Sequence, residues 1–382
     1  MILPSLSARS KEELAGKRVL VRVDLDLPVK DGKLLDAFRI KKALPTIEFL
    51  RQQQAKVVLI GHTGRDPEAT LAQISDALQD LLPHRFVHET VGESVRVASC
   101  ELAEGAVLML ENLRSQAGEK ANDPDFAAEL AHYADLYVNE SFATSHRAHA
   151  SIVGLPKVLP AYAGFQLEKE VEALGQALSP ESPSLFILGG AKFDTKLPVL
   201  RATIEHYDQV AIGGALANDF IKAQGHEVGD SLVSDDTMGI DDLVHNEKLI
   251  IPTDAVVERA DGTRALKKVS EIEVGDKILD IGPDSTRALA DSIKQACFVL
   301  WNGPLGYYEG GYAAATEAIS ELIAAHDNVS IIGGGDTIAA IAAEGLIDSF
   351  THLSTGGGAM LEFLADKGEL PGIQALLENT EQ

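Results

Sequence analysis

Cysteine, positive charge and long hydrophobic runs are scarce in this sequence. Only two cysteines, Cys100 and Cys297, occur among 382 residues, too few for a disulfide framework or a cysteine metal site. No apolar stretch approaches the ~20 residues that a membrane-spanning helix requires. The N-terminus also lacks the basic start and apolar run of a secretory signal. We therefore expect a protein of the reducing cytoplasm.

Lysine and arginine are outnumbered by acidic residues. The chain holds 33 Lys and Arg against 58 Asp and Glu, a net charge of −25. Such a chain repels nucleic acid and anionic membrane over most of its surface, so neither is expected as a partner. What the sequence does have is a 45% share of apolar residues, close to that of soluble globular proteins. Its length suits about two to three domains, and two is the simplest organisation.

Arginine and glycine are divided between the two parts of the chain. Residues 1–155 hold ten of the fourteen arginines, whereas residues 156–382 hold 25 of the 33 glycines. Arginine recognises carboxylates and phosphates through forked side-chain donors, and glycine turns let backbone N–H groups approach phosphates. This division indicates two ways of binding anions, although two domains can also differ in composition for reasons unrelated to ligands.

Apolar runs typical of strands alternate with helical segments along the whole chain. The runs are residues 19–25, 57–60, 107–110, 136–138, 185–188, 210–212, 249–251, 277–281, 298–301, 329–332 and 352–354. Several are too apolar to be half exposed, which favours strands buried on both faces of a parallel sheet. The alternation predicts an α/β fold of two Rossmann-like three-layer domains with mainly parallel sheets. Asp261-Gly262 separates the arms of an expected β-hairpin over residues 256–269.

The expected domain boundary lies near residues 155–180. Residues 164–178 place Leu167, Val171, Leu174 and Leu178 on one helical face between proline-containing segments, which indicates a single helix that joins the domains as a hinge. We predict a first domain over residues 1–160, a connecting helix over 161–180 and a second domain over 181–369. Residues 370–382 are able to pack back on the first domain.

Three predicted strands of the first domain are each followed by an arginine, at the edge where open parallel sheets bind ligands. The pairs are 57–60 with Arg65, 107–110 with Arg114, and 136–138 with Arg147. Arginines that converge on one sheet edge suit a small, multiply anionic ligand, although each one alone is more simply a solvated surface residue. His62, His146 and His149 lie among them without the spacing of zinc ligands, which favours phosphate contact or core packing.

Glycine turns take the same places in the second domain. They are GGAK (189–192), GGA (213–215), GGGDT (333–337) and TGGG (355–358), each after a predicted strand. A glycine turn before a helix aims free N–H groups and the positive end of the helix dipole at an anion. None has the spacing of a dinucleotide fingerprint or a P-loop. Asp336 is a candidate Mg²⁺ ligand and also a candidate N-cap of the following helix.

Nine motifs, taken in order, resemble those of the phosphoglycerate kinase family from end to end. They are RVDLDLP (22–28), GHTGR (61–65), ENLR (111–114), YVNESFATSHRAH (137–149), GGAKFDTK (189–196), DIGP (280–283), WNGPLG (301–306), GGGDT (333–337) and STGGGA (354–359). The resemblance implies reversible, Mg²⁺-dependent phosphoryl transfer between ATP and the carboxylate of 3-phosphoglycerate, giving ADP and 1,3-bisphosphoglycerate. It also implies a role in glycolysis and gluconeogenesis, and we expect a monomer.

The resemblance implies a role for particular residues of this sequence. The residues expected to contact 3-phosphoglycerate are Asp24, Asp26, Arg39, His62, Arg65, Arg114 and Arg147. The residues expected to contact the nucleotide are Lys196, Gly213, Gly214, Glu309, Gly334, Gly335, Asp336 and Thr337. Asp336 would also hold the metal, and Arg39 and Lys192 would stabilise the transferring group. Because the acceptor carboxylate is already ionised, the reaction needs positioning and cations rather than a general base.

The sequence departs from the family pattern at three places. Asp26 stands where the family usually has asparagine, residues 213–217 read GGALA rather than three glycines and a methionine, and the stretch 306–316 looks one residue short. We expect Asp26 either to accept a hydrogen bond from the substrate hydroxyl or to be neutralised by an arginine such as Arg22 or Arg39. The alternative is that it repels the substrate. Two other classes remain open from the residues alone, an anion-binding protein without chemistry and an NAD dehydrogenase with variant glycine turns.

Overall fold

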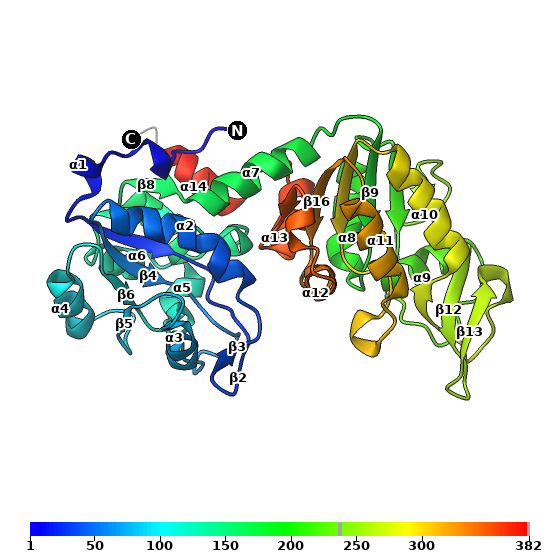
Figure 1. The fold of residues 1–382 in the computed structure, drawn as a ribbon, viewed down its shortest axis with the longest axis horizontal. Helices are drawn as coiled ribbons and strands as arrows, with labels where there is room; N and C mark the ends of the chain where they lie inside the picture. The colour runs from blue at the N-terminus through cyan, green and yellow to red at the C-terminus, as the bar shows by residue number, and fades with distance from the viewer. Residues whose placement is uncertain (236–238, 380–382) are drawn as a thin grey trace. The chain divides into compact units, whose positions relative to one another are not determined.

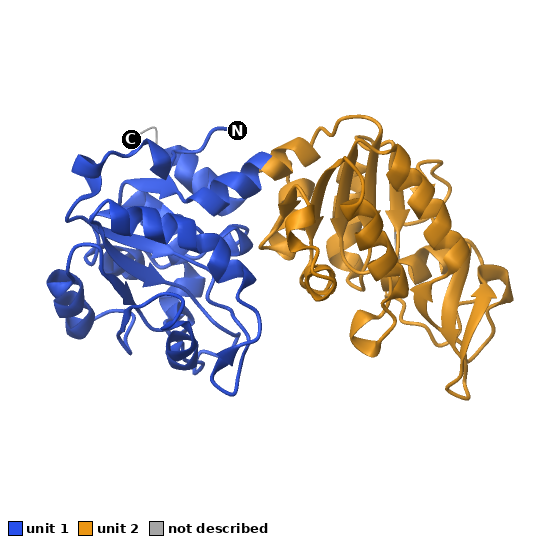
Figure 2. Ribbon diagram, in the orientation of Figure 1, with its two compact units in different colours: residues 1–172, 369–382 blue, residues 173–368 orange. Residues whose placement is uncertain are grey.

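The computed structural model describes residues 1–235 and 239–379. The chain divides into two compact units (Figure 2), a first unit of residues 1–172 with 369–382 and a second unit of residues 173–368. Each is built around its own six-stranded parallel sheet, with helices on both faces (Figure 1). The expected α/β class with mainly parallel sheets is confirmed. None of the described helices is long and apolar enough to cross a membrane.

The sheet of the first unit has the strand order β5-β6-β4-β1-β7-β8, with all neighbours parallel. The strands are β1 (Arg18–Arg22), β4 (Lys56–Ile60), β5 (Arg85–Phe86), β6 (Val107–Met109), β7 (Leu136–Asn139) and β8 (Ala161–Ala163). Four of the five residues of both β1 and β4 are buried, because helices cover both faces of the apolar run. β1 lies between β4 and β7, so the direction of strand addition reverses there, which is where open parallel sheets commonly bind ligands.

The helices of the first unit include one from the C-terminal end of the chain. They are α1 (Lys11–Leu14), α2 (Phe38–Gln52), α3 (Ala72–Leu78), α4 (Glu93–Glu101), α5 (Ala117–Ala121), α6 (Pro124–Ala131) and α14 (Pro371–Asn379), beside a small hairpin of β2 (Val29–Lys30) and β3 (Lys33–Leu34). The Asn379 side chain accepts from the Ala161 N–H at 3.0 Å and donates to the Leu159 carbonyl at 3.0 Å. These bonds attach α14 to the edge strand β8, and residues 380–382 lie outside the described residues.

The sheet of the second unit has the order β11-β10-β9-β15-β16-β17, again with all neighbours parallel. The strands are β9 (Ser184–Leu188), β10 (Gln209–Ile212), β11 (Leu249–Ile250), β15 (Phe298–Asn302), β16 (Val329–Gly333) and β17 (His352–Leu353). The helices are α8 (Phe193–Thr203), α9 (Gly214–Ala223), α10 (Pro283–Gln295), α11 (Ala314–Ala324), α12 (Gly335–Ala343) and α13 (Gly357–Ala365). β9 lies between β10 and β15, so this sheet also has a reversal point.

A separate antiparallel sheet belongs to the second unit. It consists of β12 (Asp254–Glu258), β13 (Arg264–Lys268) and β14 (Lys277–Ile281), in the order β13-β12-β14. The expected hairpin is present, since β12 and β13 pair on either side of Asp261-Gly262 and Gly262 has a φ of +80°. The sequence pattern did not predict that β14 pairs with β12 and not with the parallel sheet.

The connecting helix α7 (Phe165–Ala177) is shorter than the segment 161–180 expected to link the domains. Residues 161–163 instead form β8 and pair with β7, and the division between the units falls after residue 172. Leu167, Val171 and Leu174 are buried as their spacing predicts, whereas Leu178 lies beyond the end of the helix.

Candidate active site

The carboxyl ends of β1, β4, β6 and β7 bring four loops to one edge of the first sheet. Asn112, fully buried, ties two of them together. Its side-chain amide donates to the carbonyl oxygens of Thr63 at 3.0 Å and Ala69 at 2.7 Å, while its Oδ1 accepts from the Arg114 N–H at 3.1 Å. The loop with His62 and the loop with Arg114 are therefore held side by side. Asn112 was not predicted from the sequence as a residue that links loops. The signal that could have identified it is an amide side chain close to the end of an apolar strand.

Arg114 is a buried cation without an ion-pair partner among the described residues. It is 5% exposed, and its Nη1 donates to the Gly64 carbonyl oxygen. Its Nε is buried with no hydrogen-bond partner, and no carboxylate within the described residues forms an ion pair with it. Burial, followed by the charges of Arg147 and Arg22, lowers the pKa of Arg114. Burying the charge of Arg114 in this way costs free energy unless a bound anion compensates it.

The other cations of this edge differ in exposure. Arg65 and Arg147 are exposed, and Arg147 Nε donates to His146 Nε2 at 3.0 Å. Burial, followed by the charges of Arg147 and His149, lowers the pKa of His146 to about 4. His62 is buried, and its Nδ1 lies 2.7 Å from Nη2 of the fully buried Arg22. We call Arg39, His62, Arg65, Arg114 and Arg147 together the arginine site.

Asp24 and Arg39 form an ion pair at the rim of the arginine site. Arg39 Nη1 donates to Asp24 Oδ2 at 3.2 Å, and the Asp26 N–H donates to Asp24 Oδ1 at 3.1 Å. Burial nevertheless raises the pKa of Asp24, and Arg39 only partly offsets that effect. Asp24 therefore orients the guanidinium of Arg39, which is the second residue of α2 and remains partly exposed.

The described residues contain no ion pair between Asp26 and either Arg22 or Arg39, the two arginines named above as examples. Arg22 is engaged with His62, Ser151 and the Val23 carbonyl, while Arg39 pairs with Asp24. Asp26 Oδ1 instead accepts from the Gly64 N–H at 2.9 Å and from Thr63 Oγ1 at 3.4 Å. Its carboxylate is exposed and fastens the loop after β4 through local hydrogen bonds.

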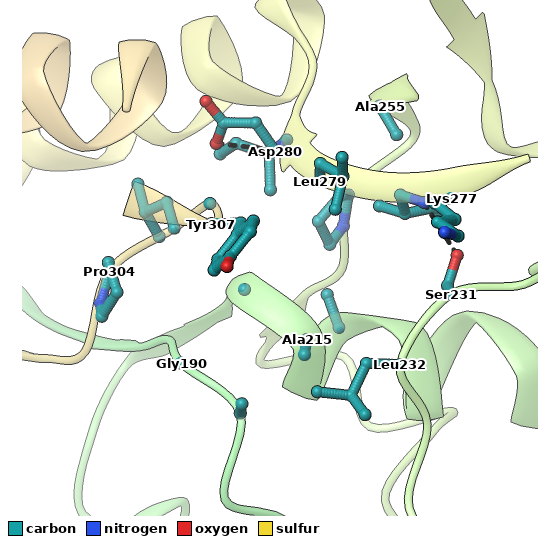
Figure 3. Close-up of a pocket in the computed structure, with 18 of the residues that line it drawn as sticks. Gly190, Ala215, Ser231, Leu232, Ala255, Lys277, Leu279, Asp280, Pro304 and Tyr307 are labelled. Carbon is teal, nitrogen blue, oxygen red and sulfur yellow. Dashed lines mark hydrogen bonds between the residues drawn. The ribbon is translucent and has the colours of Figure 1, made fainter. Parts of the chain in front are cut away.

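The second unit contains a cavity of about 530 Å³ between its glycine turns and its antiparallel sheet (Figure 3). Of the residues expected to contact nucleotide, Gly214, Glu309 and Asp336 line this cavity. Much of the remaining wall is apolar. It includes Leu232, Ala255, Ile278, Leu279 and Tyr307, none of which the sequence indicated. The apolar wall depends on β12 and β14, so it could not be inferred without their pairing.

Glycine is required where the turns after β9 and β10 meet. Gly214 has a φ of +61°, and a Cβ there would lie 2.4 Å from the Gly190 nitrogen. A Cβ at the neighbouring Gly213 would lie 2.4 Å from Leu305 Cδ2. Gly190 and Gly214 of these turns line the cavity, and at the start of α9 the N–H groups of Gly214 and Leu216 donate to the carbonyl oxygens of Leu305 and Gly190 at 2.9 Å.

Lys192 and Lys196 supply positive charge at the start of α8. Lys196 is 5% exposed, and burial, followed by the charge of Lys192, lowers its pKa to about 8. A Cβ at the cavity residue Gly190 would lie 3.4 Å from Lys196 Nζ, which places this nitrogen beside the cavity. No described carboxylate pairs with Lys196. Lys192 is the exposed N-cap residue of α8 and lies outside the cavity lining.

The start of α12 offers polar atoms without protein partners. Gly334, with a φ of +103°, is the N-cap residue, so the alternative role of Asp336 as the cap is not found. Asp336 is exposed in the first turn, followed by the fully buried Thr337, whose Oγ1 has no hydrogen-bond partner in the described part of the chain. Gly335, the first helical residue, is exposed. An orphaned hydroxyl beside a free carboxylate at a helix N-terminus suits phosphates with a bound cation.

A metal held by the protein alone is not indicated. No group of three His, Cys, Asp or Glu side chains with metal-binding geometry occurs within residues 1–235 and 239–379. Mg²⁺ needs less, because it is commonly held by one or two carboxylates together with substrate phosphates and water. Asp336, on the cavity wall, fits that requirement.

Fold and geometry together define a two-unit α/β protein with clustered arginines at one edge of the first sheet and a cavity of about 530 Å³ in the second unit. Residues 10–367 match the family model for phosphoglycerate kinase. The chain is 44% identical to a phosphoglycerate kinase of Moorella thermoacetica over 96% of this chain and 98% of the relative, and 43% identical to one of Dictyoglomus turgidum. Solved phosphoglycerate kinases are similar over 99% of the chain, from Pyrococcus horikoshii (TM-score 0.88, 32% identity, 100% of that chain) and Coxiella burnetii (TM-score 0.83, 33% identity, 99% of that chain).

The chain belongs to the phosphoglycerate kinase family. The resemblance stated from its motifs is thus confirmed, and with it the α/β fold and the activity. It is a kinase of glycolysis that transfers a phosphoryl group between ATP and a carboxyl group. The family match also decides against the NAD dehydrogenase and the non-catalytic binding protein.

Proposed function

We propose that the arginine site of the first unit binds 3-phosphoglycerate and 1,3-bisphosphoglycerate, and that the cavity of the second unit binds ADP and ATP with Mg²⁺. One shared feature carries this assignment. Arg114 and Lys196 are buried cations, one in each unit, that form no ion pair with a counter-charge among the described residues. Each is stabilised once an anionic ligand supplies that charge.

In the first unit, 3-phosphoglycerate is recognised by side chains. Arg114, Arg65 and Arg147 contact its phosphate and carboxylate as forked donors. Asp24 keeps Arg39 oriented towards the carboxylate that accepts the phosphoryl group. Asp26 and Gly64 fix the loop that carries Arg65.

In the second unit, the nucleotide is recognised by shape and backbone. The base lies against the apolar wall with Leu279 and Tyr307, and the phosphates lie at the glycine turns and at Gly334–Thr337. Lys196 neutralises phosphate charge, and Glu309 is available for the ribose hydroxyls. When bound at Asp336, Mg²⁺ supplies positive charge that neutralises the transferring phosphates.

The transfer itself needs no proton acceptor. The attacking carboxylate is ionised at neutral pH, so the chain must hold it in line, exclude water and stabilise the equatorial oxygens. Arg39 and Lys192 do this from the two units. Since donor and acceptor sites belong to different units, the reacting atoms approach to about 3–3.5 Å only when the units close, and α7 is the proposed hinge.

Two further properties belong to this proposal. The protein acts as a monomer, because each ligand site is complete within one unit of a single chain. It works in the cytoplasm, where glycolytic substrates are made and free thiols such as the exposed Cys100 and Cys297 stay reduced.

Calorimetry on paired variants tests the assignment. Arg114→Met should abolish measurable 3-phosphoglycerate binding and leave ADP binding intact, while Lys196→Met should do the reverse. Arg96→Met and Lys294→Met are matched controls, because both side chains are exposed and form only surface ion pairs. Loss of ADP binding in Arg114→Met, with the protein still folded, would assign the ligands to the wrong units. ATP-dependent acyl-phosphate formation, trapped with hydroxylamine, checks the reaction itself.

A further inference from the structure

The guanidinium of Arg22 is fixed against His62. Arg22 is the last residue of β1 and is fully buried. Its Nη2 lies 2.7 Å from His62 Nδ1, its Nε donates to Ser151 Oγ at 3.1 Å, and its Nη1 donates to the Val23 carbonyl oxygen. All three guanidinium nitrogens are engaged, so the group cannot turn without losing a buried hydrogen bond.

A buried carboxylate supports this position from behind. Ser151 donates its hydroxyl to Glu119 Oε1 at 2.6 Å and its N–H to Glu119 Oε2 at 3.0 Å. Although burial alone would raise the pKa of Glu119, its interactions with His149, Arg22 and Ser151 lower it. Glu119 therefore stays ionised and balances the charge of Arg22 through Ser151.

The contact determines which nitrogen of His62 carries the proton. A guanidinium has only N–H donors and stays protonated in proteins. His62 Nδ1 must then present its lone pair, which leaves the single ring proton on Nε2. A second proton on Nδ1 would set two N–H groups and two positive charges against each other at 2.7 Å.

The surroundings of His62 also oppose a charged ring. His62 is 5% exposed, and its pKa is lowered well below the usual range by burial, then by the charges of Arg22, Arg114 and Arg147, and by His149. No residue in the described part of the chain accepts a hydrogen bond from Nε2, so that donor is left for a ligand.

We propose that Arg22 is a positioning residue that fixes His62 in its neutral Nε2–H tautomer, so that His62 serves the substrate as a hydrogen-bond donor and not as a cation or a base. The atom that receives this hydrogen bond is an oxygen of 3-phosphoglycerate. That second part rests on the proposed function of the arginine site, whereas the tautomer does not.

Long-range ¹H–¹⁵N NMR of the full chain with ¹⁵N-labelled histidine observes the tautomer, with His62 assigned from His62→Gln. His84 is an internal control, because its Nδ1 lies 2.6 Å from the Leu82 carbonyl oxygen, which can only accept, and its Nε2 lies 2.8 Å from Ser75 Oγ. His84 should therefore show the Nδ1–H pattern and His62 the opposite one, unchanged from about pH 5 to about pH 8. A His62 ring that titrates near the ordinary pKa of about 6.5, or that carries its proton on Nδ1, overturns the proposal.

Variants separate the role of Arg22 from that of burial. Arg22→Met should let His62 exchange between tautomers, while Arg22→Lys, which keeps a cationic donor, should largely restore the fixed form. Because either change could prevent folding, Ser151→Ala is the milder test. It removes one anchor of the guanidinium, and a minor population of the other tautomer is expected. If His62 kept the fixed Nε2–H form in every folded variant, the proposal that Arg22 positions His62 would be wrong.

Kinetics test the contact with substrate. Glutamine can place an amide N–H near the position of Nε2, and leucine cannot. His62→Gln should keep the KM for 3-phosphoglycerate within several-fold, whereas His62→Leu should raise it about tenfold or more, with a smaller effect on kcat. Equal KM values in the two variants would overturn the donor role. If 3-phosphoglycerate binds elsewhere, calorimetry on Arg114→Met shows that separately, and the tautomer result is unaffected.

Discussion

The two units are proposed to bind anions in different ways, and they also differ in net charge. The first unit has 20 Lys and Arg against 28 Asp and Glu, a net charge of −8, while the second has 13 against 30, a net charge of −17. The more acidic unit is the one proposed to bind the more highly charged ligand. It does so with helix starts, two lysines and Mg²⁺, so local arrangement outweighs overall charge within a Debye length of about 8–10 Å.

The ligands explain this difference between the units. 3-phosphoglycerate has almost no apolar surface, so its recognition depends on forked donors such as Arg114 and on the residues that orient them. A nucleotide offers a flat base, which an apolar wall can bury, and phosphates that backbone N–H groups can reach. Under the proposed assignment, side chains therefore carry the specificity in the first unit, and backbone geometry carries it in the second.

The largest effect is expected at Lys192. This exposed cation is expected to stabilise the transferring phosphoryl group in the transition state and not the bound substrates. Lys192→Met should therefore lower kcat by about 10²–10³-fold with little change in either KM. Steady-state kinetics with each substrate varied provide the measurement. Lys294→Met, an equivalent loss of charge on the surface of the same unit, should have nearly wild-type rates. A normal kcat with a raised KM for nucleotide would mean that Lys192 merely binds.

Backbone geometry in the second unit is tested at Gly214. In Gly214→Ala the new Cβ would lie 2.4 Å from the Gly190 backbone nitrogen. The backbone at this position also has a φ of +61°, which alanine rarely adopts. We expect roughly 1–3 kcal/mol lower unfolding free energy and a raised KM for nucleotide, measured by denaturant titration and kinetics. Gly358→Ala is the control, since nothing lies within 4 Å of its Cβ position. If both variants behaved alike, the close approach of the two turns would not matter.

Asp336 tests whether the acidic unit uses a metal. Asp336→Asn should raise the Mg²⁺ concentration needed for half-maximal activity several-fold, because an amide is a weaker ligand than a carboxylate. Unfolding free energy should hardly change, since Gly334 and not Asp336 is the cap of α12. Asp348→Asn, at another exposed position of the second unit, is the control. A loss of stability with unchanged Mg²⁺ dependence would instead indicate that Asp336 caps α12.

The sequence predicted the elements of both units well, because their signals are local. Apolar runs such as 57–60 become buried strands, and the glycine pairs mark turns before helices. It could not predict contacts made between distant segments. The sequence did not indicate that the buried Arg22 donates a hydrogen bond to Ser151, 129 residues further on. The pairing of β14 with β12, and hence the apolar wall of the cavity, is likewise non-local.

A smaller effect concerns the pH dependence of Lys196, whose pKa burial lowers to about 8 from 10.5. In the free protein its charge is lost above about pH 8, so ADP affinity should fall several-fold from about pH 7 to about pH 9, and binding near pH 8 should take up a proton. Calorimetry in buffers of different ionisation enthalpy measures both. Lys196→Arg stays charged and should abolish the dependence. An unchanged affinity in the parent chain would show that Lys196 does not touch phosphate.

The lowered pKa of Lys196 also makes the free energy of unfolding depend on pH. The folded pKa of Lys196 lies below the unfolded value, so between about pH 8 and 10.5 the unfolded chain binds more protons. The cost of burying this lysine is fully present below pH 8 and is relieved as pH rises through that window. The parent chain should therefore gain stability over this range relative to Lys196→Met.

The smallest effect is expected at Asp26, which places a negative charge at the edge of the arginine site. Its Oδ1 accepts from the Gly64 N–H and Thr63 Oγ1, bonds that an asparagine oxygen can also accept. Its carboxylate also lies close enough to Arg114 to raise the pKa of that guanidinium, so it partly balances a buried cation. Asp26→Asn should leave the KM for 3-phosphoglycerate unchanged or raise it slightly. Leu25 and Leu27 on either side are buried, so the loop should keep its course. A several-fold fall in KM, largest at low ionic strength, would instead mean that Asp26 repels the substrate. In that case the first unit would limit its own affinity through one local charge.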